Sequence, residues 1–118
     1  TGNEGALNKE DIDTLARTIY GEARGESHQG KIAIAYSVLN RVKAKSWFGN
    51  TITEVCRKPW QYSCWNEDDP NLAKLTAVTL DNRDFQKCYC AALEAGLGLI
   101  PDPTSGSKHY HTKNISPS

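Results

Sequence analysis

Two glutamates, Glu22 and Glu26, stand four residues apart in the stretch YGEARGES, residues 20–27, where an apolar-patterned segment ends. In a helical projection Glu22 falls about 80° from the centre of the apolar face, and Glu26 about 40° if the helix continues so far. Burial of an ionised carboxylate costs several kcal/mol unless it is paired, so such a group either finds a cation or binds a proton. Arg24 is a local cation for one of the two.

A carboxyl group that is protonated near neutral pH is what cleavage of a glycosidic bond requires, because the leaving oxygen must receive a proton. The competing interpretation is structural, with a glutamate at the helix end capping the next helix or pairing with Arg24. Spacing alone favours the structural interpretation. Catalysis stays as the alternative that further motifs must support.

Helical patterns on both sides are expected to position this stretch. Asn8 predicts the start of a first helix, and Gly25 can end it after Glu22 or Ala23. Thr51 and Glu54 have capping-box form ahead of a short helix that Pro59 stops. The expected helices span about 9–23, 28–46, 52–57 and 81–97, the last ending near Gly96 or Gly98.

Two further segments lack a helical period. Residues 59–71, PWQYSCWNEDDPN, are expected to form a surface loop rich in aromatic side chains. Residues 108–112, KHYHT, could form a strand with His109 and His111 on one face. The fold class expected is α+β but mainly α, a single compact domain over residues 1–118 with a small β-hairpin element.

Composition limits the classes of partner. A chain of 118 residues has room for one domain, and its 14 basic and 14 acidic residues give no net charge. That balance argues against a nucleic-acid partner and is compatible with a groove for an uncharged or mixed-charge polymer. No apolar run has membrane-spanning length. A monomer is expected. The chain starts at Thr1 and contains no Met, so the lack of a visible secretory signal says little about the compartment in which the protein acts.

Four cysteines, Cys56, Cys64, Cys88 and Cys90, permit two disulfides in three connectivities, or buried thiols. Cys88 and Cys90 would point in opposite directions from a helix, so they are not expected to bond each other. His109 and His111 raise the possibility of zinc, but no H-E-x-x-H pattern accompanies them. Neither a metal nor a cofactor is therefore expected.

Longer motifs extend the argument beyond the two glutamates. Residues 16–42, ARTIYGEARGESHQGKIAIAYSVLNRV, resemble the signature of the cell-wall hydrolase family of the spore-cortex-lytic type, with relatives in phage lysis and virion proteins. PWQYSCW is similar to the family's Pro-x-Gln-Phe-Ser element, with Tyr62 in place of Phe. DPTSGSKHYH is similar to its Asp-Pro-Thr-x-Gly-Ala element followed by an aromatic pair, with Ser107 in place of Ala.

The resemblance implies a lysozyme-like, mainly α catalytic domain that cleaves peptidoglycan between N-acetylmuramic acid and N-acetylglucosamine. By position, Glu22 is the catalytic acid and Glu26 a second catalytic-site residue that orients or supports it. An aromatic sugar groove is expected from pyranose stacking. The candidate substrate-binding residues are Tyr20, Trp60, Gln61, Tyr62, Ser63, Trp65, His109 and Tyr110. The short chain and its HYH ending favour a phage endolysin or virion lysin acting at the bacterial cell wall.

The reaction itself stays open between several mechanisms. A lytic transglycosylase needs only Glu22 as acid and then base, and this mechanism is favoured because the motif marks one acid. A muramidase needs a second carboxylate, for which Glu26, Glu67, Asp68 and Asp69 are candidates. A zinc-dependent N-acetylmuramoyl-L-alanine amidase and a non-catalytic wall-binding module are the remaining alternatives.

Overall fold

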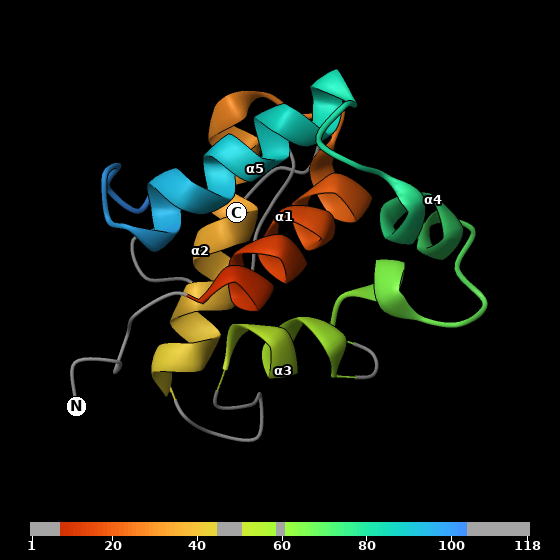
Figure 1. Ribbon diagram of the computed structural model, residues 1–118. Coiled ribbons are helices and arrows are strands. Elements are labelled where there is room, and N and C mark those ends of the chain that lie inside the picture. The colour runs from red at the N-terminus through yellow and green to blue at the C-terminus, as the bar shows by residue number, and fades with distance from the viewer. Residues whose placement is uncertain (1–7, 45–50, 59–60, 104–118) are drawn as a thin grey trace, which may run out of the picture.

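A computed structural model describes residues 8–44, 51–58 and 61–103 as a compact helical body (Figure 1). Its elements are α1 (Lys9–Ala23), α2 (His28–Ala44), α3 (Ile52–Arg57), the short 3-10 helix η1 (Ser63–Trp65), α4 (Asn71–Ala77) and α5 (Arg83–Gly96). The expected compact and mainly helical character is confirmed.

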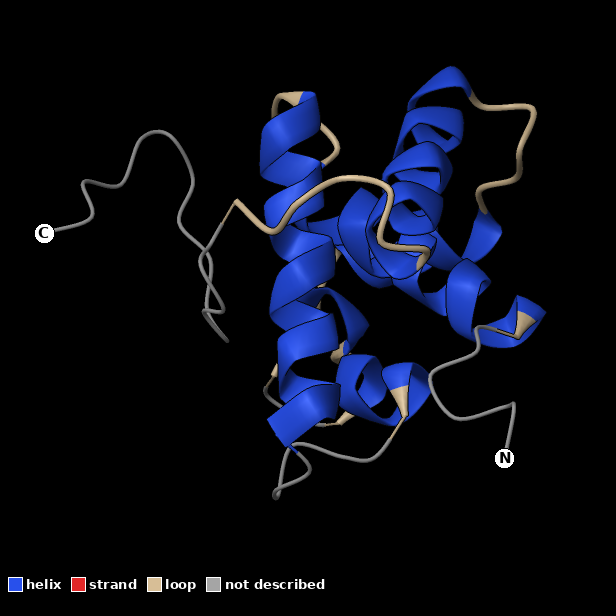
Figure 2. Ribbon diagram, turned by 90° about the vertical axis from the view of Figure 1, so that its left-hand side faces the viewer, coloured by secondary structure: helices blue, strands red, loops and turns tan. Residues whose placement is uncertain are grey.

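The described part of the chain contains helices and loops but no strand (Figure 2), which gives no support to the expected β-hairpin. The segment predicted as a strand, residues 108–112, lies outside the described residues. None of the helices in the described ranges combines the length and the apolar character that crossing a membrane requires.

Polar caps fix where three of the helices begin. The Asn8 side chain accepts a hydrogen bond from the Asp11 backbone N–H at 2.7 Å, and Thr51 accepts one from Glu54 at 3.0 Å. Asn82 caps α5 by accepting from the Phe85 N–H at 3.0 Å. Such caps satisfy backbone donors that have no partner within the helix. The predicted starts near residues 9 and 52 are therefore confirmed.

The end of α5 depends on a glycine in the left-handed region. Gly98 has φ of +72°, and the Leu99 N–H turns back to the Glu94 carbonyl at 2.8 Å. This geometry is typical of a glycine-terminated helix. Gly25, which was expected to end α1 in a similar way, has no positive φ, and an added Cβ there would meet nothing within 4 Å. The first helix thus ends without help from glycine geometry.

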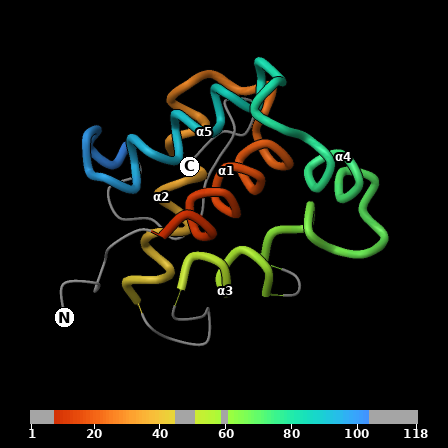
Figure 3. The backbone as a smooth tube through the Cα atoms, viewed as in Figure 1, coloured from red at the N-terminus to blue at the C-terminus, as the bar shows by residue number. Residues whose placement is uncertain are grey.

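The first helix, α1, is the centre of the fold. It contacts α2, α3, α4, α5 and η1, and Figures 1 and 3 show it surrounded, with α3 below it and α4 to its right. Its fully buried apolar residues Leu15, Ala16 and Ile19 join a core that includes Val55 and Phe85. Side chains in the last turn of α1 are therefore held by neighbours on several sides.

The prediction that residues 59–71 form only a surface loop is wrong. Tyr62 and Cys64 are 3% and 1% exposed, Ser63–Trp65 form η1, and the chain enters α4 at Asn71. Neither η1 nor α4 has the repeated apolar spacing from which a helix is predicted. In α4, for example, Leu75 is the one buried residue. Tertiary packing rather than periodicity holds this region.

Arg17 ties the C-terminal end of α4 to the central helix. The Arg17 guanidinium donates to the carbonyls of Leu75 and Val78 at 2.7 and 2.8 Å, and to the Asp13 carboxylate at 2.7 Å. It also lies 5.1 Å from the centre of the Phe85 ring. Carbonyls at a helix C-terminus have no partner within the helix, and a cation there is favourable.

We predict that Arg17→Met lowers the free energy of unfolding by about 1 to 2 kcal/mol, because it removes charge-assisted hydrogen bonds and keeps the aliphatic stem. Chemical denaturation measures this. Arg83→Met is the matched control, since Arg83 is exposed at the first position of α5. Equal losses from both variants would contradict the role given to Arg17.

Candidate active site

The carboxylate of Glu22 is held by the backbone of a distant segment. Glu22 lies in the last turn of α1, is partly buried, and its Oε2 accepts a hydrogen bond from the Cys64 backbone N–H at 3.2 Å. Cys64 is the central residue of η1. A backbone donor cannot rotate away as a side chain can, so η1 fixes one oxygen of the carboxylate.

Gly21 makes this approach possible. A Cβ at position 21 would lie 2.6 Å from Cys64 Cβ, 2.7 Å from Cys64 Sγ and 2.8 Å from Leu75 Cδ2. Those distances are shorter than atoms in real structures tolerate. The glycine before Glu22 therefore lets η1 and α4 pack directly on the α1 backbone. Sequence reasoning missed this role, although the glycine in GEARGE was its visible signal.

Tyr62 precedes Cys64 by two residues, and its side chain lies inside the core. Its hydroxyl is 2.8 Å from Ser37 Oγ, and the Arg41 guanidinium lies 5.0 Å from its ring centre. Burial raises the pKa of Tyr62, and the hydrogen bond with Ser37 and the charge of Arg41 oppose that effect in part. A ring that is 3% exposed presents no face on which a sugar can stack in this structure. Its extra hydroxyl, compared with Phe, bonds to α2.

Three side chains of α2 bind segments that come later in the chain. Ser37 contacts Tyr62, the Arg41 guanidinium donates to Gln61 Oε1 at 2.8 Å, and Asn40 Nδ2 donates to Asp102 Oδ2 at 3.0 Å. Gln61 also donates to the Val55 carbonyl at 3.2 Å. The motif pieces recognised in the sequence thus meet along one helix. For Gln61 these bonds provide a structural reason to be present, and a sugar contact stays a prediction.

The remaining predicted site residues are distributed unevenly. Tyr20 is 9% exposed and packs edge-on against Phe85 with ring centres 5.9 Å apart, so most of its ring belongs to the core. Ser63 is exposed and Trp65 is partly buried. Trp60, His109 and Tyr110 lie outside the described residues.

Glu26 occupies the turn between α1 and α2. Its N–H donates to the Ala23 carbonyl at 2.9 Å, and its own carbonyl accepts from the buried Lys31 ammonium. A Cβ at Gly30 would lie 2.9 Å from Glu26 Cβ, so that glycine makes room for the glutamate. The backbone of Glu26 is therefore fixed from both helices, and the role of its carboxylate stays a prediction.

The sequence indicates Arg24 as a cation for one of the glutamates. In the structure its guanidinium donates to the Tyr20 carbonyl at 3.3 Å and to Asn71 Oδ1 at 3.1 Å. It also lies 4.7 Å from the centre of the Tyr20 ring. These contacts connect the end of α1 to the start of α4.

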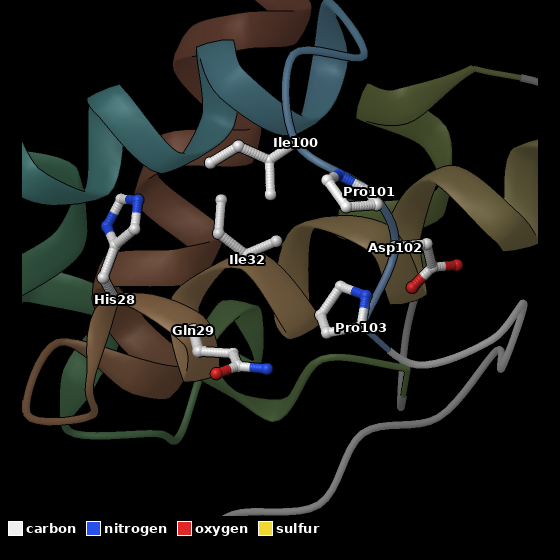
Figure 4. A pocket seen from close by; sticks show the side chains of 7 residues that line it. All are labelled: His28, Gln29, Ile32, Ile100, Pro101, Asp102 and Pro103. Atoms are coloured by element: carbon white, nitrogen blue, oxygen red, sulfur yellow. The ribbon is translucent and has the colours of Figure 1, made fainter.

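A cavity of about 470 Å³ lies between α2 and the segment that follows α5, and Glu22 is not among the residues that line it (Figure 4). It is lined by His28, Gln29, Ile32, Ile100, Pro101, Asp102 and Pro103. Its lining is mainly apolar, and its two titratable residues are engaged elsewhere, His28 with Glu94 and Asp102 with Asn40. We therefore place the candidate chemistry at Glu22, where a carboxylate is oriented, and not in this cavity.

All four cysteines are free thiols, three of them buried and Cys90 exposed. This resolves the alternatives that the sequence left open, and it confirms that Cys88 and Cys90 point in different directions. Burial raises the pKa of Cys56 to about 12 and that of Cys88 to about 11. Since the unfolded chain ionises these thiols at lower pH, the free energy of unfolding falls as the pH rises from about 9 toward 11.

We predict that a disulfide-exchange reagent at mildly alkaline pH modifies Cys90 rapidly in the native protein and the other three cysteines after unfolding. The thiolate is the reactive form, and burial suppresses it at the three other positions. Mass spectrometry of the modified peptides identifies the sites. Rapid modification of Cys64 in the native protein would contradict the packing of η1 on α1.

Within residues 8–44, 51–58 and 61–103, no group of three or more His, Cys, Asp or Glu side chains is placed to hold a metal ion. The pair His109 and His111 lies outside these ranges.

Comparison with known proteins agrees with the motifs. The family model for cell wall hydrolases matches residues 25–118. The chain belongs to the cell wall hydrolase family. The model match begins three residues after Glu22, but similarity to individual relatives extends over the whole region.

Two relatives carry that wider similarity to this cell wall hydrolase chain. The spore cortex-lytic enzyme of Bacillus subtilis (strain 168) is 39% identical over 116 residues, which covers 97% of this chain and 33% of the relative. The spore cortex-lytic enzyme of Halalkalibacterium halodurans is 36% identical over 110 residues, covering 92% of this chain and 29% of the relative. The chain thus spans about a third of the length of these relatives. No solved structure matches it significantly, so the lysozyme-like architecture stays a prediction.

We predict that Gly21→Ala destabilises the protein by about 1 to 3 kcal/mol through overpacking, although alanine is the better helix former. Activity should fall further than the loss of folded protein explains, because Cys64 is displaced from Glu22. Gly25→Ala is the matched control, since a Cβ there meets nothing within 4 Å. Thermal denaturation and wall-degradation assays of both variants test this, and wild-type behaviour of Gly21→Ala would contradict it.

Proposed function

We propose that this chain cleaves the glycosidic bond between N-acetylmuramic acid and N-acetylglucosamine in bacterial peptidoglycan, with Glu22 as the general acid. The observation that supports this most directly is the partly buried Glu22 carboxyl, with one oxygen fixed by the Cys64 N–H at 3.2 Å. Membership of the cell wall hydrolase family supports the substrate class. A positioned carboxyl group at a helix end suits proton transfer to a leaving oxygen.

The reaction we favour is lytic transglycosylation. Glu22 protonates the glycosidic oxygen, and the bond from that oxygen to the anomeric carbon of muramic acid breaks. The C6 hydroxyl of the same muramic acid ring then attacks the anomeric carbon, and Glu22, now a carboxylate, takes the hydroxyl proton. The product is a 1,6-anhydro-muramic acid end, and the enzyme returns to its starting protonation state. This route needs one carboxyl group, which matches a motif that marks one.

Hydrolysis is the second candidate, and it requires another carboxylate on the opposite side of the sugar. Glu67 and Asp68 are exposed beside η1, and Asp69 accepts a hydrogen bond from the Asn71 N–H at 2.8 Å. Glu26 lies in the turn that follows α1. If the products carry ordinary reducing ends, substitutions at these four positions are the variants to examine.

We propose that residues 1–118 act as one catalytic domain at the cell wall or spore cortex. The spore cortex-lytic names of the relatives support this location. The phage endolysin or virion lysin origin favoured by the sequence stays a prediction, as do the monomeric state and the sugar contacts of Trp60, His109 and Tyr110.

We predict that Glu22→Gln lowers the rate of glycan cleavage by about 100-fold or more, the size of a general acid's contribution, and leaves the fold intact. Purified peptidoglycan is digested in water labelled with heavy oxygen, and the muropeptides are identified by mass spectrometry. The wild-type protein is expected to release 1,6-anhydro-muramic acid ends without heavy oxygen, because no water enters the product. Glu10→Gln is the matched control, because Glu10 is exposed in the first turn of the same helix.

The other outcomes separate the alternatives. Labelled reducing ends that disappear with Glu22→Gln would replace transglycosylation by hydrolysis and direct attention to Glu26 and the three acidic residues after η1. Intact glycan strands that have lost their peptides, produced only when zinc is supplied, would make the chain an amidase. Binding to the wall without any product, unchanged by Glu22→Gln, would make it a wall-binding module.

A further inference from the structure

We propose that Trp65 is a positioning residue for Glu22 and acts through the buried hydroxyl of Thr18; this inference rests on the proposed function of Glu22. The Trp65 indole N–H donates to Thr18 Oγ1 at 2.8 Å. Thr18 precedes Glu22 by one helical turn on α1, so both side chains lie along the same side of the helix. A sugar-stacking role was the expectation for Trp65 from the sequence.

The Thr18 hydroxyl is built to accept this bond. Thr18 is 0% exposed, and its hydroxyl donates its own proton to the Thr14 carbonyl at 2.8 Å. With that proton committed, the oxygen faces its other neighbours as an acceptor. The indole N–H, which can only donate, is the complementary group. The bond therefore pairs a group that can only donate with an oxygen that can still accept, which makes it specific as well as favourable.

The consequence for Glu22 follows from the shortness of η1. A 3-10 helix of three residues has little stability of its own and keeps its position through tertiary contacts. Cys64 and Trp65 are adjacent residues of η1, and both donate hydrogen bonds to α1. The Cys64 N–H binds Glu22, and the Trp65 indole N–H binds Thr18. The Trp65 bond therefore sets where the Cys64 N–H points, and so which way the Glu22 carboxyl faces.

The indole ring also has a second contact. The Arg57 guanidinium, at the end of α3, lies 4.6 Å from the centre of the Trp65 ring. The ring is thus held between α1 and α3 by a hydrogen bond on one side and a cation on another. This placement fits a wedge that fixes η1 better than it fits a platform for sugars.

The test measures kcat and KM for release of anhydro-muropeptides from solubilised glycan strands by Trp65→Phe and Thr18→Val. Each variant removes one partner of the same bond. Because displacement of a catalytic group by about 1 Å can cost about 100-fold, kcat is expected to fall by roughly 10- to 100-fold in both variants. KM is expected to stay within about twofold of the wild-type value, since positioning acts on the chemical step.

Three controls separate positioning from general damage. The double variant is expected to lose no more than the worse single variant, because the two changes remove one interaction. Thr18→Ser, which keeps the hydroxyl, is expected to recover most of the kcat that Thr18→Val loses. Thr76→Val is the matched threonine control, since Thr76 is exposed on α4. All assays are run well below the melting temperature of the least stable variant.

The results that would contradict the role of Trp65 differ from the result that would contradict the role of Glu22. A raised KM with unchanged kcat in Trp65→Phe would restore the sugar-stacking role, and a fall in kcat that only follows the folded fraction would make Trp65 purely structural. Either result overturns the inference while Glu22→Gln stays inactive. Full activity of Glu22→Gln would instead remove the proposed function itself. If Trp65→Phe fails to fold, the contrast between Thr18→Val and Thr18→Ser decides the question.

Discussion

The structure depends on the burial of α1 among all the other helical elements of the described chain. A helix enclosed in this way must satisfy every polar group on its surface and must allow close approach wherever a neighbour crosses it. Thr18 meets the first requirement by bonding to Thr14 and receiving Trp65, and Gly21 meets the second by leaving room for Cys64. The proposed acid therefore projects from the most firmly held element of the fold, at the point where that element is still packed on several sides.

The second helix has a complementary role. Its residues Ser37, Asn40 and Arg41 bind three separate segments, at Tyr62, Asp102 and Gln61. Buried polar side chains are costly unless they are paired, so such contacts fix one arrangement of the chain against alternatives. All six of these residues lie in the stretches that resemble the family's motifs. A residue that belongs to a family motif need not touch the substrate, and for Gln61 and Tyr62 the contacts within the protein are sufficient to explain the residue type.

The long helices could be predicted because their signals are local. Asn8, Thr51 and the apolar spacing along α1, α2 and α5 lie within a few residues of the boundaries they set. The short elements η1 and α4 could not be predicted, because Arg17, Trp65 and Gly21 hold them through contacts with partners more than forty residues away. The same distinction applies to the candidate site. The sequence marks Glu22 through its motif, but no local pattern indicates that a backbone N–H at position 64 orients it, or that the ring of Tyr62 is enclosed.

The hydrogen bond between Glu22 and the Cys64 N–H joins residues 42 positions apart. Closing a chain segment of that length has an entropic cost that only the completed core repays. The oriented form of the carboxyl group is thus a property of the whole folded domain and not of the stretch that carries the motif. During synthesis the chain cannot assemble this arrangement until η1 has emerged and docked. A growing or partly unfolded molecule therefore lacks the oriented Glu22 carboxyl, and the activity proposed for Glu22 would arise only together with the native state.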